Sequence, residues 1–477
     1  MQFNSFEFVF FFIFVFFAYW ILASRGSKLC NVFLLFSSYF FYGWWDYRFL
    51  SLIIISSICD YTVGRLIFSS NSPRNKKIFL IASVSINLFI LGVFKYFNFF
   101  ADSLAVVMSS FGIEPSFVTM NIVLPAGISF YTFQTMTYSI DIYRGRMRPT
   151  KDIIAFFAYV AFFPQLVAGP IERANRFLPQ FLKRRTLTWG RVSDGSRQII
   201  SGLLKKVVVA DNLAPHVDYV FSNYNTLDSA SLLTGGVFFA FQIYGDFSGY
   251  SDMAIGTARL LGFDLSKNFD YPYFSRNIAE FWRRWHISLS TWFRDYLYIP
   301  LGGSIYSSKR TLFNILTTFL LCGLWHGASW KFVVWGMLHA LYFIPLVAFG
   351  KHHVAEKVVA HDKILPGIKD VLSILLTFSA VVIAWIFFRA DSLTDSVLYL
   401  SRMISGPLLS SDHERFYQGF SIIAVFLLLE WIKRRDDYFF DIKEYPLLLR
   451  HAIYYMAFFT LIMLGRVDHA PFIYFQF

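Results

Sequence analysis

A histidine lies inside a long apolar stretch in the second half of the chain. The stretch begins after Arg310 and continues, with few charged residues, to about Gly350. If residues 311–326 form a helix, a rise of about 1.5 Å per residue places His326 roughly 24 Å from Arg310. This histidine would then lie deep within the hydrocarbon core of a bilayer, which is about 30 Å thick. An ionisable side chain at that depth is a functional candidate. Because neutral imidazole is a common general base near neutral pH, we expect His326 to be a catalytic base.

A second candidate cluster occupies residues 282–286, with the sequence Trp-Arg-Arg-Trp-His. The guanidinium groups of Arg283 and Arg284 could hold a phosphate or carboxylate on an acyl donor. In this interpretation the cluster forms the cytoplasmic mouth of a tunnel, and His286 could line that tunnel at its cytoplasmic end. In the alternative interpretation, the cluster is a surface helix whose arginines snorkel and whose tryptophans lie in the membrane interface.

Two carboxylates, Asp246 and Asp252, lie among glycines in an apolar segment at 231–258. Carboxylates in a membrane-spanning segment are costly unless they are paired. One of them could orient His326 or bind a substrate hydroxyl, and either could equally serve a structural role by pairing with an arginine. The sequence leaves both roles open.

The three cysteines are odd in number and lie in apolar segments, so they predict neither a disulfide framework nor a metal site. Cys322 precedes His326 by four residues and therefore shares its helix face. A Cys–His nucleophile is conceivable, although cysteine also serves as a small apolar filler. Small and hydroxylic residues at 124–134 predict close helix packing.

The composition sets the class of protein that must position these groups. Of 477 residues, 56% are hydrophobic and only 16% are charged, whereas soluble domains average about 25% charged residues. Apolar runs long enough to span a bilayer recur along the chain, which predicts an all-α polytopic membrane protein. The formal net charge of +12 fits basic loops held on the cytoplasmic side, and we expect no nucleic-acid partner.

In the first part of the chain, basic residues alternate between successive loops, which predicts an N-terminus on the outside. Five spans are predicted there, at 6–22, 29–45, 49–68, 78–100 and 121–143. The next apolar segment, 153–169, has basic flanks on both sides and is interrupted by prolines, so we expect it to be re-entrant. An ordinary span with an atypical outer loop is the alternative.

In the second part, large apolar residues at helical spacing predict an amphipathic helix over 279–293, lying in the membrane surface. Residues 311–326 and 331–349 should form a hairpin whose bend carries His326. Further spans are expected at 198–220, 231–258, 370–388, 418–432 and 447–465. About 12 crossing segments result. They form one integral membrane domain, 1–477, with N-terminal spans at 1–150, a catalytic core at 151–350 and C-terminal spans at 351–477.

Several motifs resemble those of the membrane-bound O-acyltransferases. Residues 321–343, LCGLWHGASWKFVVWGMLHALYF, resemble the histidine motif of that family. Other segments resemble, in the same order, its bacterial branch typified by alginate O-acetyltransferase: 124–145, 162–181, 242–256, 268–303, AWIFFRA at 384–390 and PFIYFQF at 471–477. Members that handle D-alanine for teichoic acids share part of this pattern, whereas VAGPIERANRFLPQF and the FIYFQF ending are more similar to the polysaccharide acetylators.

The resemblance implies a ring of about 12 tilted helices, with re-entrant segments, around a thin funnelled core. It implies that His326 is the catalytic histidine and that His286 is the second motif histidine. Trp325, next to His326 in the sequence, is a further candidate for donor binding beside Arg283 and Arg284. The donor would be acetyl-CoA or another acyl thioester, with no bound cofactor. The protein would lie in the bacterial inner membrane and pass acetyl groups to a periplasmic transferase of an exopolysaccharide machinery.

We therefore expect an enzyme that moves an acetyl group from a cytoplasmic thioester across the membrane, for O-acetylation of an exported polysaccharide such as alginate. The same residues could instead transfer D-alanyl or another acyl group. Broken helices and buried charges also fit a transporter or flippase, although two repeated halves do not show in the hydropathy. A non-catalytic membrane scaffold is a third possibility.

Overall fold

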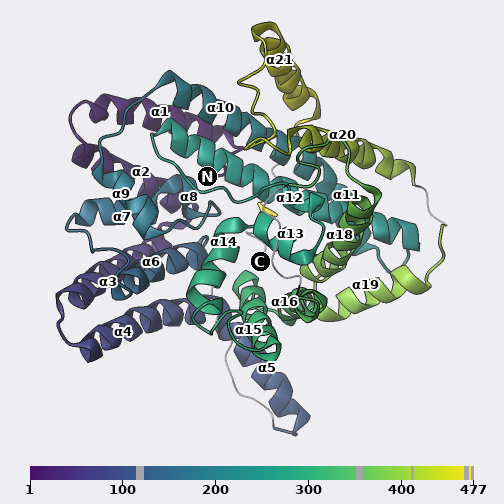
Figure 1. Ribbon diagram of the computed structural model, residues 1–477, viewed down its shortest axis with the longest axis horizontal. Helices are drawn as coiled ribbons and strands as arrows, with labels where there is room; N and C mark the ends of the chain where they lie inside the picture. Colours follow the sequence, from purple (N-terminus) through teal and green to yellow (C-terminus); the bar gives the residue numbers. More distant parts are fainter. Residues whose placement is uncertain (114–122, 351–357, 410–412, 467–471, 474–477) are drawn as a thin grey trace. The chain divides into compact units, whose positions relative to one another are not determined.

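The computed structural model describes residues 1–113, 123–350, 358–409, 413–466 and 472–473 (Figure 1). The first two residues of the predicted span 121–143, and all but two residues of the PFIYFQF ending, lie outside this part. The described residues form helices joined by turns and loops, with no strand. The all-α class is therefore confirmed.

Seven helical segments of the described chain are long and apolar enough to cross a membrane: Phe6–Ala23, Ser27–Ser69, Pro73–Ser110, Trp330–Ala348, Ile368–Arg389, Glu414–Lys433 and Leu447–Leu464. The second and third contain 43 and 38 residues, enough for two crossings each, because about 20 residues span the hydrocarbon core. The multi-pass architecture is confirmed, and the ring of about 12 crossing helices stays a prediction.

The chain forms two compact units, and their boundary falls within helices α10 (Trp189–Leu203) and α12 (Ser229–Leu260). Unit 1 comprises Met1–Gly195 and Ala254–Ser266. Besides parts of α10 and α12, it contains α1 (Phe6–Ala23), α2 (Ser27–Asp46), α3 (Leu50–Ser69), α4 (Pro73–Leu91), α5 (Phe97–Ser110), α6 (Ile128–Tyr143), α7 (Ile153–Ala161), α8 (Phe163–Leu166) and α9 (Ala174–Leu182).

Buried polar groups hold α3, α4 and α6 of unit 1 together. Asp60 on α3 is fully buried and accepts hydrogen bonds from Asn87 Nδ2 at 2.7 Å, from Ser139 Oγ at 2.6 Å and from the Ser83 hydroxyl. Small hydroxyl and amide side chains let these helices approach closely. Residues 128–134 are buried on α6, as the predicted close packing of 124–134 requires.

The apolar segment predicted to be re-entrant is broken within unit 1. Helix α7 has nine residues and α8 has four. At about 1.5 Å per residue, α7 is roughly 14 Å long, less than half the thickness of the hydrocarbon core. That the segment enters and leaves by the same face of the membrane stays a prediction.

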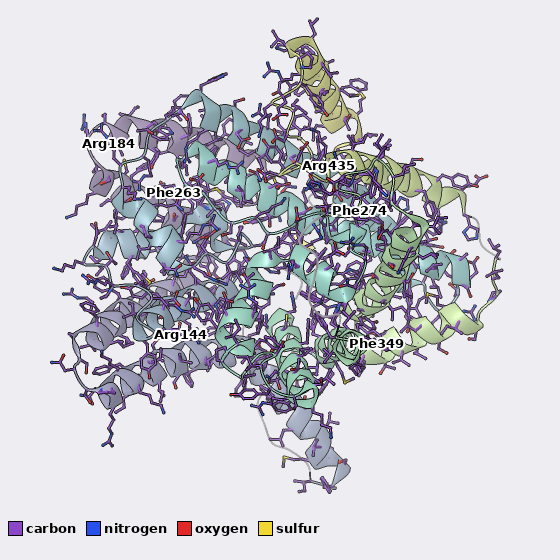
Figure 2. All side chains as sticks on the ribbon, in the orientation of Figure 1. Arg144, Arg184, Phe263, Phe274, Phe349 and Arg435 are labelled. Carbon is purple, nitrogen blue, oxygen red and sulfur yellow. The ribbon has the colours of Figure 1, made fainter. Side chains whose placement is uncertain are left out.

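Unit 2 comprises Ser196–Met253 and Lys267–Phe477. Besides the remaining parts of α10 and α12, it contains the π-helical segment η3 (Leu204–Ala210), α11 (Asp211–Ser222), α13 (Ile278–Arg284), α14 (Ile287–Phe293), α15 (Ser308–His326), α16 (Trp330–Tyr342), α17 (Ile344–Ala348), α18 (Ile368–Arg389), α19 (Leu393–Ser405), α20 (Tyr417–Lys433) and α21 (Leu447–Leu464). Many apolar side chains of this unit point outward, such as Phe349, which is 75% exposed (Figure 2). Such a surface suits a lipid environment.

The predicted hairpin around His326 is confirmed by α15 and α16, which pack against each other (Figure 1). Two glycines allow this approach. A Cβ atom on Gly323 would overlap the backbone carbonyl of Phe332, and one on Gly336 would overlap the carbonyl of Phe319. The two backbones therefore touch directly, and His326 lies at the end of the first helix.

The single amphipathic helix predicted over 279–293 is wrong in two respects. It is broken into α13 and α14 at His286, whose backbone has φ +42°. Its large apolar side chains, among them Trp285 and Leu289, are fully buried in protein and do not cover a membrane surface. The break arises because the backbone of Asn268 accepts a hydrogen bond from the N–H of Ile287 at 2.9 Å, which draws α14 out of line with α13.

Candidate active site

Helix α15 carries His326 as its last residue. The Ser307 side chain caps the start of the helix by accepting a hydrogen bond from the backbone N–H of Arg310 at 3.4 Å. The helix ends because Gly327 adopts an extended conformation, with φ −162° and ψ 151°. The side chain of His326 is buried, with 5% of the residue exposed.

Aromatic rings from three helices surround His326. Its ring centroid lies 5.0 Å from Trp325 on α15, 4.9 Å from Trp335 on α16 and 5.4 Å from Phe388 on α18. All three rings meet the imidazole edge to face, with interplanar angles of 76° to 82°. Such contacts restrict the orientation of the imidazole.

The second motif histidine lies beside the first. The ring centroids of His286 and His326 are 6.5 Å apart, and Trp325 lies against both, at 6.0 Å from His286. His286 is fully buried and stands at the break between α13 and α14. The fold thus brings together two histidines that the sequence placed in separate motifs.

The protonation state of His286 follows from its hydrogen bond to Asn268. His286 Nδ1 lies 3.2 Å from Asn268 Oδ1, and that oxygen also accepts from the backbone N–H and the hydroxyl of Ser288. An oxygen that accepts from a backbone N–H must be the amide carbonyl, so Nδ1 carries the proton. Burial lowers the pKa of His286 to about 3. The ring is therefore neutral at physiological pH, with its proton on Nδ1.

The two arginines predicted to bind the donor have different surroundings. Arg284 is buried and pairs with Asp270 at 2.7 Å and with Glu280 at 3.2 Å. Its guanidinium is thereby committed to holding α13 to the preceding loop. Arg283 is exposed and forms no ion pair within the part of the chain that the structure describes. Of the two, Arg283 has the guanidinium that can meet an anionic ligand.

Both carboxylates of α12 pair with lysines of the segment η3. Asp252 lies 2.9 Å from Lys205 Nζ, and Asp246 lies 2.8 Å from Lys206 Nζ. Asp246 also accepts a hydrogen bond from the backbone N–H of Ile473 at 2.7 Å. These contacts fit the structural role that the sequence left open, with lysine in place of the expected arginine.

The other candidates of the histidine motif are buried in unit 2. Trp325 is 3% exposed and lies between the two histidines. Cys322 is 4% exposed on α15. Its thiol forms no hydrogen bond with any described group, and this environment favours its role as a small apolar filler.

Sequence reasoning missed a third buried histidine in this cluster. His339 on α16 is fully buried, and its Nδ1 accepts a hydrogen bond from Trp282 Nε1 at 3.2 Å. Its ring lies 4.7 Å from Trp335, which itself contacts His326. The sequence did contain a signal for His339. It follows Trp335 by four residues within an apolar helix, so the two share a helix face, and an ionisable residue in such a helix is a functional candidate.

These groups can move a proton in a dry environment. The imidazole of His326 can accept a proton from a hydroxyl group if that hydroxyl reaches hydrogen-bonding distance. His286 supplies a neutral ring beside it, and the aromatic rings exclude water from both. Acyl transfer to a hydroxyl needs such a base at the point where donor and acceptor meet.

Comparisons with known proteins agree with this chemistry. The model of the MBOAT, membrane-bound O-acyltransferase, family matches residues 146–388, which include both motif histidines. The chain is 43% identical to the probable alginate O-acetylase AlgI of Pseudomonas aeruginosa, over 82% of this chain and 73% of the relative. It is 36% identical to the protein of the same name from Pseudomonas putida, over 100% of both chains.

A relative that acts on a different polymer is also similar. The peptidoglycan O-acetyltransferase of Helicobacter pylori is 34% identical over 85% of this chain and 80% of the relative. The chain thus belongs to the membrane-bound O-acyltransferase family and is a multi-pass membrane enzyme that transfers an acyl group from an acyl donor to a hydroxyl.

Proposed function

We propose that this enzyme takes an acetyl group from a thioester donor on the cytoplasmic side of the bacterial inner membrane and delivers it for O-acetylation of an exported polysaccharide such as alginate. One observation carries the proposal: His326 is held among aromatic rings with its centroid 6.5 Å from that of His286. Relatives named for alginate and for peptidoglycan acetylation support acetyl as the acyl group.

In the proposed reaction, His326 acts as the general base. The acceptor hydroxyl oxygen forms a bond to the thioester carbonyl carbon while its proton passes to a ring nitrogen of His326. The carbonyl electron pair moves to oxygen and gives a tetrahedral oxyanion. When this pair returns, the carbon–sulfur bond breaks, and the departing thiolate takes the proton from His326. An ester and a thiol result, and the base is regenerated.

Other residues support this step by binding and positioning. The exposed guanidinium of Arg283 is the group we assign to an anionic part of the donor, such as a phosphate of acetyl-CoA. Trp325 contacts both histidines and would hold the acyl group against them. The neutral ring of His286 would orient the reactants beside His326. The acceptor hydroxyl would belong to the polysaccharide or to a periplasmic transferase that relays the acetyl group.

The test is acetyl transfer by membranes that contain the His326→Ala variant. With a labelled acetyl donor, we expect transfer to fall to background because the variant lacks the imidazole that takes the hydroxyl proton. His286→Ala should reduce the rate without abolishing it. His361→Ala, at an exposed histidine, is the matched control and should transfer normally. Full labelling by His326→Ala would overturn the proposal.

The competing functions give other outcomes. A D-alanyl transferase would label its acceptor from a D-alanyl thioester and leave an acetyl donor unused. A transporter or flippase would move an intact lipid-linked substrate without acyl transfer. If the complex assembled and acetylated normally with His326→Ala, the protein would be a scaffold. Measuring donor consumption and product acylation together separates these cases.

A further inference from the structure

Two buried polar side chains project from one face of helix α16 beside His326. Trp335 and His339 are four residues apart, so they share a face of the helix. Their ring centroids lie 4.7 Å apart, and the Trp335 ring lies 4.9 Å from His326. Both residues are 0% exposed. Neither has a part in the proton transfer described above.

Each of these side chains offers an N–H group that has no acceptor within the part of the chain that the structure describes. The indole Nε1 of Trp335 has no hydrogen-bond partner within the described chain. In His339, Nδ1 accepts the N–H of Trp282 at 3.2 Å. Because an indole nitrogen only donates, Nδ1 must carry the lone pair, and the neutral ring has its proton on Nε2. His339 Nε2 also finds no partner among the described groups.

Buried N–H groups without acceptors are uncommon, because each has lost its hydrogen bonds to water and gained none in return. The indole N–H groups of Trp285 and Trp385 also have no hydrogen-bond partner within the described chain. The N–H groups of Trp335 and His339 differ in that they share one helix face, and the Trp335 ring contacts the proposed base. Rigid packing fixes both rings. Trp335 also packs on Trp385 at 5.8 Å, and His339 stacks on Phe281 at an interplanar angle of 3°. Donors held in this way are preorganised for an oxygen that arrives with the substrate.

We propose that Trp335 Nε1–H and His339 Nε2–H bind the carbonyl oxygen of the acyl donor and stabilise the oxyanion that forms from it. This inference rests on the proposed function, because it names the groups that receive the charge when the acceptor oxygen attacks. Donors aimed at developing negative charge in a water-excluded site strengthen as that charge grows. Neither donor gives up its proton, and the proton from the acceptor remains on His326 until the thiolate leaves.

The experiment measures kcat and KM for the acyl donor in Trp335→Phe and His339→Phe, which keep an aromatic ring and remove the N–H. The loss of one such donor should lower kcat by about 10²-fold, while KM stays near the parent value. His339→Gln retains an amide N–H and should recover part of the rate. Thermal unfolding in detergent establishes that each variant is folded.

The matched control is Trp385→Phe. Trp385 is 1% exposed and packs on Trp335 from the same aromatic cluster. Its indole N–H also has no hydrogen-bond partner among the described groups, but Trp385 forms no ring contact with His326 within the described chain. This variant should keep kcat near the parent value. Equal losses of kcat in Trp335→Phe and Trp385→Phe would show a general packing effect and overturn the proposal.

Two further results would overturn it. One is an unchanged kcat in folded Trp335→Phe and His339→Phe, and the other is a raised KM with kcat unchanged, since that pattern indicates binding of the ground state only. Failure of the proposed function is distinct from these. It would appear as full activity in His326→Ala, whatever the two donor variants do.

Discussion

At the scale of single residues, the site depends on which ring atoms carry protons. Asn268 fixes His286 by accepting its Nδ1–H at 3.2 Å, and burial lowers the pKa of His286 to about 3. The neutral form of His286 therefore predominates at pH values above about 3. A charged side chain in place of Asn268 would change the pKa of His286 while keeping its ring.

We expect Asn268→Asp to shift the pH dependence of the reaction. A carboxylate at position 268 favours the imidazolium form and raises the pKa of His286, so the neutral ring is lost at a higher pH as the solution becomes acidic. The acid limb of kcat/KM should therefore move to higher pH. Asn223→Asp, at an exposed asparagine, is the control with an unchanged profile. Identical profiles for both variants would contradict the role of Asn268.

The two motif histidines could be predicted from the sequence, because an ionisable ring in an apolar run needs a reason to be there. The partners of the charged candidates, such as Arg284 and Asp252, could not be predicted from the sequence. Arg284 and Asp252 had equally plausible free and paired states, and pairing depends on side chains that only the fold brings close, such as Lys205 for Asp252. His339 was passed over because its partner, Trp282, lies on a different helix.

At the scale of elements, the hairpin of α15 and α16 positions His326 against Trp335. Its geometry depends on Gly336, where a Cβ atom would overlap the carbonyl oxygen of Phe319. We expect Gly336→Ala to force the helices apart, lower the thermal stability and reduce acyl transfer. Overpacking of this kind typically costs about 1–3 kcal/mol of stability, and thermal unfolding in detergent measures it.

A second glycine provides the comparison for this prediction. Gly190 lies in helix α10, and a Cβ atom there would meet nothing within 4 Å. Gly190→Ala should be neutral or slightly stabilising, because alanine loses less backbone entropy on folding. If Gly336→Ala proved as stable and active as Gly190→Ala, the direct backbone contact in the hairpin would not be needed for the site.

Hydropathy could predict α15 and α16, since each is a single apolar run bounded by turn residues. The prediction of one continuous helix at 279–293 is wrong. Large apolar residues keep their helical spacing across that segment, but the helix is broken at His286. The Ile287 N–H donates to the backbone of Asn268, so a tertiary contact overrides the local periodicity there. Helix breaks of this origin leave little trace in the sequence.

At the scale of the whole molecule, composition predicted the membrane class, while the number of crossings could not be read from apolar runs. Helix α7 is apolar but has only nine residues, whereas the spans predicted at 29–45 and 49–68 correspond to the separate helices α2 and α3. Orientation follows from a different property, the distribution of basic residues between loops. It can therefore be tested separately from the number of crossings.

We expect the loop after α6 to face the cytoplasm and the end of α5 to face outward, because basic residues are retained inside. Arg148 and Asp102 are both exposed, which makes them suitable for introduced cysteines in a Cys59→Ser background, where the remaining Cys30 and Cys322 are buried. An impermeant thiol reagent should label Asp102→Cys in intact cells and Arg148→Cys only after the membrane is opened. The opposite pattern would invert the orientation. A cytoplasmic thioester would then no longer follow from the orientation. The accessibility of Arg283, which we assign to the acyl donor, would have to show on which side the donor binds.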